Sequence, residues 1–189
     1  MRSVRVYDLM TLDGVIQAPH PNEEFEHAGW AVPYQDEVML SNATQGMGGD
    51  GALLLGRRTY ESMAAAWTIA PKENTFTAVM NNYKKYVASR TLSGPLQWQN
   101  SELLDGDARD AVAALKEQDG PDLVVLGSGK LIGSLMDASL IDELVLPIHP
   151  LVLGSGQRLF PDDAPPAKLQ LVDAKPTTTG VLITTYRPA

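Results

Sequence analysis

Two short glycine-containing segments carry the residue types best suited to binding an anion. Segment 56–59 reads Gly-Arg-Arg-Thr and follows the apolar run 52–55, and segment 127–129 reads Gly-Ser-Gly and follows the apolar run 123–126. Where a strand passes directly into a helix, the first backbone N–H groups of the helix can hold a phosphate, and arginine and threonine add further donors. A glycine is also an ordinary way to turn a corner, so either segment alone is ambiguous, whereas the two together favour a ligand site.

The second segment does not follow the usual dinucleotide fingerprint. Gly133 comes one residue late for that pattern, and no clear ribose-binding acid follows ~20 residues further on. The chain contains no P-loop pattern either. The two segments therefore predict phosphate binding without predicting a Rossmann domain.

Asp13 is the best candidate for a catalytic acid or base. It lies in the sequence Thr-Leu-Asp-Gly at the end of the first expected strand, on the side where α/β sheets bind ligands. Thr11, in the same turn, is a candidate for the same reason. Asp-Gly is equally a preferred turn pair, so plain turn chemistry is the open alternative for both residues.

Four further residues are candidates for contacting a substrate. Trp30 could line a ring-binding pocket or pack into local core. Asp36 opens an expected helix, where a solvated first-turn carboxylate is the alternative. Gly154 and Gly156 lie beside Arg158 and could bind a substrate phosphate or form a simple bend.

Alternating strands and helices are expected to position these residues. The run 52–55 is apolar throughout, which is typical of a strand covered on both faces. The stretch 15–33 is rich in proline and shows little apolar periodicity, so we interpret it as a flap on the substrate side. We expect strands at 4–9, 52–55, 77–80, 85–88, 123–126, 143–148, 169–174 and 181–186, and helices at 34–45 (ended by Gly46, Gly48 and Gly49), 57–66, 107–118 and 131–136.

This order predicts an α/β fold of three layers. It has a mixed central β-sheet with helices on both faces and a C-terminal antiparallel hairpin. With 189 residues and 44% hydrophobic content, we expect one domain over residues 1–189.

Composition narrows the choice of partners and location. The formal net charge is −8 and the basic residues are scattered, so we expect no nucleic-acid partner. No apolar run approaches the ~18 residues of a membrane span, and we expect a cytoplasmic protein. There is no cysteine, and His20, His27 and His149 lack a shared metal-site spacing, so no metal is expected.

Three segments resemble the dihydrofolate reductase family. Residues 55–63 read Leu-Gly-Arg-Arg-Thr-Tyr-Glu-Ser-Met and are similar to its strand and helix over the cofactor pyrophosphate. Residues 87–90 resemble its adenosine-side strand end, and residues 125–132 its glycine pair near the nicotinamide. Within this superfamily, segments 11–14 and 150–161 look more like the reductase domain of bifunctional riboflavin biosynthesis proteins and its free-standing relatives.

The resemblance implies the dihydrofolate-reductase-like fold and an NADPH cofactor. NADPH is preferred over NADH because an arginine lies at the end that would hold the adenosine 2′-phosphate. The implied cofactor-binding residues are Gly56, Arg57, Arg58, Thr59, Ser89, Arg90, Gly127, Ser128, Gly129, Lys130, Leu131 and Ile132.

The implied activity is NADPH-dependent reduction of a heterocyclic substrate. The substrate would be 5-amino-6-(5-phosphoribosylamino)uracil, as in the riboflavin pathway, or a related pterin or flavin, with a C=N or carbonyl group reduced. Dihydrofolate reductases carry a carboxylate on the helix after the first loop, but here the matching place falls near Met39 and Leu40. A nucleotide- or flavin-binding module without turnover and a divergent dihydrofolate reductase therefore stay open. Relatives in this family are often dimers, so a homodimer is expected.

Overall fold

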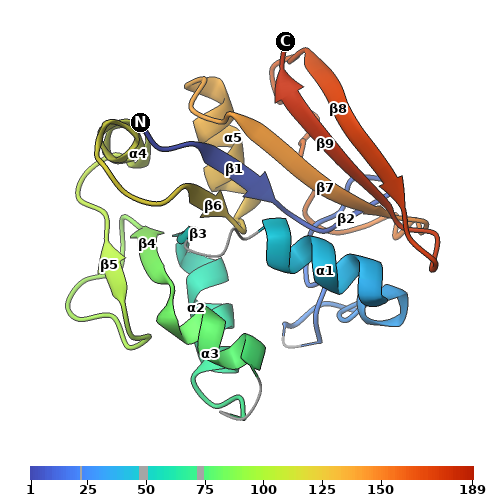
Figure 1. Ribbon diagram of the computed structural model, residues 1–189, viewed down its shortest axis with the longest axis horizontal. Helices are drawn as coiled ribbons and strands as arrows, with labels where there is room; N and C mark the ends of the chain where they lie inside the picture. The colour runs from blue at the N-terminus through green and yellow to red at the C-terminus, as the bar shows by residue number, and fades with distance from the viewer. Residues whose placement is uncertain (22, 47–50, 72–74) are drawn as a thin grey trace.

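The protein folds around a central sheet flanked by helices on both faces (Figure 1). The computed structural model describes residues 1–21, 23–46, 51–71 and 75–189. Within them the strands are β1 (Val4–Tyr7), β2 (Met10–Thr11), β3 (Ala52–Gly56), β4 (Lys84–Ala88), β5 (Ser101–Leu103), β6 (Leu123–Val125), β7 (Glu143–His149), β8 (Leu169–Pro176) and β9 (Leu182–Pro188). The helices are the short 3-10 helix η1 (Val32–Tyr34), α1 (Glu37–Gly46), α2 (Arg57–Trp67), α3 (Thr75–Asn82), α4 (Ala108–Glu117) and α5 (Gly129–Asp137).

The sheet is mixed, as the sequence predicts. Its strand order is β5-β4-β3-β6-β1-β7-β9-β8, with β2 also pairing with β7. The strands from β5 to β7 are parallel, whereas β9 pairs antiparallel with both β7 and β8. The C-terminal hairpin and the three-layer α/β class are therefore confirmed.

The apolar character of the central strands follows from their double coverage. Four successive residues of β3, from Ala52 to Leu55, have no exposed surface. Leu54 packs in a core with α4 and α5, while Leu53 and Leu55 pack in a second core with α1, α2 and α3. Because side chains alternate along a strand, a strand between two helical layers must be apolar at every position.

Two details of the secondary structure differ from expectation. Residues 77–80 were expected to form a strand but belong to α3, where Thr77 and Met80 are both buried. Their three-residue spacing places them on one helical face, so packing overrides the local β-propensity. Strand β5 was not anticipated, and it joins the sheet through β4. Two of the glycines expected to end the first helix, Gly48 and Gly49, lie outside the described residues.

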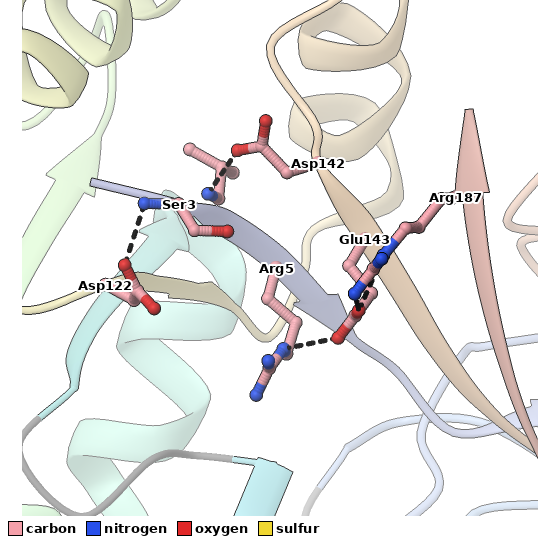
Figure 2. A network of polar contacts seen from close by, with 7 residues as sticks. Ser3, Arg5, Asp122, Asp142, Glu143 and Arg187 are labelled. Atoms are coloured by element: carbon pink, nitrogen blue, oxygen red, sulfur yellow. Dashed lines mark hydrogen bonds and ion pairs between the residues drawn. The ribbon is translucent and has the colours of Figure 1, made fainter. Parts of the chain in front are cut away.

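The amino ends of the central strands are held by acidic side chains (Figure 2). Asp122 accepts a hydrogen bond from the backbone N–H of Ser3 at 2.8 Å, and Asp142 accepts one from Val4 at 2.7 Å. Beside them lies a depression of about 400 Å³ lined by Met1, Arg2, Ser3, Arg5, Lys116, Asp142, Glu143 and Arg187. This edge of the sheet is opposite to the one where the two glycine segments lie.

Candidate active site

The two glycine segments lie at the point where the chain changes direction across the sheet. Strand β3 continues through α2 toward β4 on one side, whereas its neighbour β6 continues through α5 toward β7 on the other. Helices α2 and α5 consequently cover opposite faces, as their separate cores show. In open α/β sheets a ligand crevice forms at this kind of switch point, outside the carboxyl ends of the strands.

The two turns are in direct contact. The backbone N–H of Gly56 donates to the carbonyl oxygen of Gly127 at 3.0 Å. A Cβ on Gly56 would lie 2.5 Å from Ser128 Oγ and 3.0 Å from Ser128 N, so only glycine fits. Gly127 has φ +105°, and a Cβ there would lie 3.1 Å from Thr59 Oγ1. The sequence predicts both glycines as ligand residues, and the structure shows that they also let the turns meet.

The helices that open at these turns have free amino ends. Gly56 and Ser128 are the N-cap residues of α2 and α5, and neither makes a side-chain capping hydrogen bond. In α4, by contrast, the side chain of Asp107 accepts a hydrogen bond from Arg109 N. The first-turn N–H groups of α2 and α5 therefore have no side-chain cap, which is the arrangement found where a helix amino end holds an anion.

Segments 56–59 and 89–90, both predicted to bind the cofactor, are close in space. The guanidinium of Arg57 donates to Thr91 Oγ1 at 2.9 Å, just after β4. Ser89 Oγ accepts hydrogen bonds from the N–H groups of Thr91 and Leu92, which orders this turn. Arg58 and Arg90 are exposed, so their charges are open to a ligand.

The remaining predicted cofactor residues are distributed along α5. Lys130 is exposed, whereas Leu131 and Ile132 are buried in the core between α4, α5 and the sheet. The N–H of Ile132 donates to Ser128 O within the helix. Gly129, Leu131 and Ile132 therefore anchor the start of α5, and Lys130 extends toward solvent.

Asp13 and Thr11 form a connected turn that holds the loop after β7. Thr11 Oγ1 donates to Asp13 Oδ1 at 2.6 Å, and Asp13 accepts from the N–H groups of Leu153 and Gly154. The hydrogen bond from Thr11 is the main reason that the pKa of Asp13 lies below its ordinary value. A carboxylate held in this way stays ionised near neutral pH and is poorly suited to donate a proton.

The loop after β2 and the loop after β7 pack together beside α5. Ile16 N donates to Gln157 O at 2.9 Å, and Ile16 Cδ1 lies 2.8 Å from the position of a Cβ on Gly129. A Cβ on Gly156 would lie 2.8 Å from Val15, so this glycine permits the close contact, whereas Gly154 faces open space. The predicted substrate glycines thus belong to a two-loop wall next to the amino end of α5.

Trp30 and Asp36 have structural partners. Trp30 is buried, its Nε1 donates to Gln17 O at 2.7 Å, and its ring meets that of His149 edge-on at 4.9 Å. Asp36 accepts hydrogen bonds from Met39 N and from the hydroxyl of Thr178, at 2.8 and 2.6 Å. These bonds, that of Thr178 first, keep the pKa of Asp36 below its ordinary value.

Asp8 is a site residue that the sequence reasoning missed. It directly follows β1, is 9% exposed, and its Oδ2 is buried without a hydrogen-bond partner among the described residues. Burial raises the pKa of Asp8 to about 8. The signal was present in the alternation of Val4 and Val6, which continues to a charged residue at a position expected to be apolar.

Two further features bear on cofactors and location. In the described ranges, no three His, Asp or Glu side chains gather closely enough to hold a metal ion. None of the helices in these ranges is long and apolar enough to span a bilayer.

A switch point of the sheet at which two helices without side-chain caps begin is typical of α/β proteins that bind anionic or nucleotide ligands. The chain belongs to the RibD C-terminal domain family, whose model matches residues 2–183. It is 28% identical over 184 residues to YyaP of Bacillus subtilis (strain 168), covering 94% of this chain and 90% of YyaP. YwjB of the same organism is 28% identical over 182 residues, covering 92% of this chain and 91% of YwjB. Both relatives are described only as uncharacterized proteins.

Solved structures share the fold across nearly the whole chain. A putative riboflavin biosynthesis protein from Shewanella sp. PV-4 has a TM-score of 0.67 at 20% identity, covering 99% of both chains. A pyrimidine reductase-like protein from Corynebacterium diphtheriae has a TM-score of 0.66 at 13% identity, covering 100% of this chain and 92% of that one. Dihydrofolate reductase from Enterococcus faecalis, complexed with NADP(H), has a TM-score of 0.63 at 15% identity, covering 98% and 96%. The fold is therefore dihydrofolate-reductase-like.

Proposed function

We propose that this protein is an NADPH-dependent reductase of a heterocyclic substrate of the aminopyrimidine, pterin or flavin type. The observation that carries the proposal is the contact between the Gly56 and Gly127 turns at the switch point of the sheet. Membership of the RibD C-terminal domain family supports it, as does the likeness to a dihydrofolate reductase solved with NADP(H).

The donors around the two glycine turns fit a dinucleotide phosphate. The free amino ends of α2 and α5, with Arg57, Arg58 and Thr59, would hold the pyrophosphate. Ser89 and Arg90 would hold the 2′-phosphate, and segment 127–129 would lie at the nicotinamide end. Because the net charge is −8, these local donors must outweigh an unfavourable overall field.

The substrate would lie between the nicotinamide end and the wall formed by the loops after β2 and β7. On α1, the position near which dihydrofolate reductases place a carboxylate is occupied by Met39, which is buried in the core. This favours an aminopyrimidine ribosyl phosphate over dihydrofolate. When bound, NADPH would supply a hydride to a C=N or carbonyl carbon, and the protein would position the ring and exclude water.

Cofactor binding is tested by titrating the protein with NADPH and with NADH and following cofactor fluorescence. We expect NADPH to bind at micromolar concentration and more tightly than NADH. Arg90→Ala should weaken NADPH binding about tenfold, equivalent to losing one charge-assisted contact, and leave NADH binding unchanged. Arg187→Ala, on the opposite edge of the sheet, is the matched control and should bind both cofactors as the unmodified protein does.

The binding results distinguish between the possible functions. If neither cofactor binds at micromolar concentration, the reductase proposal is rejected. If both bind equally and Arg90→Ala affects them equally, Arg90 does not hold the 2′-phosphate. Turnover is then assayed from the loss of nicotinamide absorbance, with 5-amino-6-(5-phosphoribosylamino)uracil, dihydrofolate and quinones as acceptors. If the cofactor binds but no acceptor is reduced, the protein is a binding module.

A further inference from the structure

Asp8 lies where the two halves of the candidate site meet. It directly follows β1, whose neighbours in the sheet are β6 and β7. Asp8 Oδ2 is 3.9 Å, and Thr59 Oγ1 is 3.1 Å, from the position that a Cβ on Gly127 would occupy. The position that a side chain of Gly127 would occupy is therefore close to both the carboxyl of Asp8 and the hydroxyl of Thr59.

The burial of the Asp8 carboxyl is only partly compensated, by a hydrogen bond from the N–H of Leu9. Asp8 Oδ2 accepts no hydrogen bond, and no ion pair joins it to another side chain in the described part of the chain. Asp13 and Asp36, in contrast, each accept hydrogen bonds from both backbone and side-chain donors. An unpaired buried carboxyl costs free energy, and such costs are concentrated at functional sites.

The surroundings keep a proton on this carboxyl. Burial is the main cause that raises its pKa to about 8, and the N–H of Leu9 opposes the effect. No charged group contributes to this shift. The position of a Cβ on Gly127, after β6, lies near both the carboxyl and Thr59 of α2, and the backbone N–H of Asp8 donates to Val145 O of β7 at 3.3 Å. A carboxyl in this state can donate a proton at neutral pH, which neither Asp13 nor Asp36 can do.

We propose that Asp8 is the proton donor of the reaction, acting on the ring nitrogen or carbonyl oxygen of the heterocyclic substrate. This inference rests on the proposed reductase function. NADPH, once bound, supplies the hydride and becomes NADP⁺. The C=N or C=O carbon gains the hydride, the π-electron pair moves to the heteroatom, and that heteroatom takes the proton of Asp8. The Asp8 carboxylate then recovers a proton from water, so charge and atoms balance.

The experiment compares Asp8→Asn with Asp122→Asn. Asparagine has the shape of aspartate but cannot donate an acidic proton, and Asp122 is an aspartate at the opposite end of the neighbouring strand β6. With 5-amino-6-(5-phosphoribosylamino)uracil as the acceptor, Asp8→Asn should lower kcat by about 10²- to 10⁴-fold, the range for a lost general acid. Its NADPH dissociation constant should stay within about threefold, far less than the roughly tenfold loss expected for one broken cofactor contact. Asp122→Asn should change neither quantity.

Two readouts separate a proton donor from a structural residue. The unmodified protein should lose kcat/KM as pH rises through about 8, because the donor becomes ionised, and this limb should be absent from the residual activity of Asp8→Asn. The carboxyl carbon signal of Asp8 in ¹³C NMR, identified by its loss in Asp8→Asn, should titrate near that pH in the cofactor-free protein.

The outcomes distinguish failure of this inference from failure of the proposed function. If the protein reduces the acceptor and Asp8→Asn does so equally well, or if the carboxyl signal titrates near pH 4, Asp8 is not the donor. If Asp8→Asn loses NADPH binding instead of kcat, Asp8 is a cofactor contact and the proposal is overturned. If NADPH does not bind the unmodified protein, the reductase function fails, and the donor role fails with it.

Discussion

Acidic side chains have hydrogen-bond or ion-pair partners at the amino ends of the central strands, whereas one at the carboxyl ends has an unpaired oxygen. At the amino ends, Glu143 forms ion pairs with Arg5 at 2.8 Å and with Arg187 at 3.1 Å (Figure 2), and Asp122 and Asp142 accept backbone hydrogen bonds. At the carboxyl ends, Asp8 is buried beside Gly127 with Oδ2 unpaired. Acidic residues thus form ion pairs and hydrogen bonds at the amino ends of the strands, while Asp8 at the carboxyl ends keeps one buried oxygen without a partner.

Whether an acidic side chain has partners distinguishes residues that stabilise the fold from residues whose polar atoms are available to a ligand. Satisfied acids at the amino ends bind the first backbone N–H groups of β1, which would otherwise lack partners. An unsatisfied carboxyl lowers stability, and proteins retain such groups where activity needs them. The depression of about 400 Å³ lies at the amino ends of the strands, so shape alone does not point to Asp8.

The largest effect that tests this comparison is on stability. We expect Asp8→Asn to be more stable than the unmodified protein above pH 8, by up to about 5 kcal/mol from a pKa difference of roughly four units. The pKa is about 8 in the folded state and about 3.9 in the unfolded chain. Between these values folding retains a proton that the unfolded chain releases, so stability of the unmodified protein falls as pH rises from about 4 to about 8. Urea unfolding at pH 5, 7 and 9 measures the difference.

A pH-independent effect of Asp8→Asn on stability would contradict this prediction. If Asp8→Asn is equally destabilised at every pH, Asp8 has an ordinary packing role and the contrast between the two edges disappears. Asp122→Asn provides the control, and its effect on stability should not grow between pH 5 and 9.

A smaller effect is expected from filling the contact between the glycine turns. Gly56→Ala places a Cβ 3.0 Å from the backbone nitrogen of Ser128, which cannot rotate away. The overpacking should cost about 1–3 kcal/mol in unfolding free energy and separate the turns, so that NADPH binding weakens. Gly133→Ala is the matched control, because a Cβ there meets nothing within 4 Å, and replacing glycine within a helix should stabilise by about 0.5–1 kcal/mol. Urea unfolding and NADPH titration of both variants measure these effects; unchanged NADPH affinity in Gly56→Ala would separate the turn contact from the cofactor site.

The smallest effect on stability is expected at the amino ends of the strands, where the acidic side chains have partners. Glu143→Gln removes the charge between Arg5 and Arg187, which are partly exposed, and should cost about 1 kcal/mol or less in unfolding free energy. NADPH affinity and its pH dependence should not change. A Glu143→Gln variant with altered cofactor affinity would show that the two edges are coupled.

Much of the fold could be predicted because its signals are local. The fully apolar run of β3, the glycine turns and the C-terminal hairpin each follow from a few adjacent residues. The prediction for segment 77–80 was wrong because its β-branched residues favour a strand locally. In the folded protein the segment is helical, and this buries Thr77 and Met80 on one face. Strand β5 could not be predicted, since three half-exposed residues gain their structure only by pairing with β4.

By itself, the sequence determined the family, most of the strands and helices, and the glycine turns at positions 56 and 127, because these depend on residue type and spacing along the chain. Only the tertiary structure decided which acid keeps a buried oxygen without a hydrogen-bond partner. Asp13 and Asp36, the candidates in the sequence, accept hydrogen bonds from segments more than 100 residues away, while Asp8 is left unpaired by strands that pair from distant parts of the chain. Hydrogen bonding and burial arise between such segments, and they set which carboxyl keeps its proton.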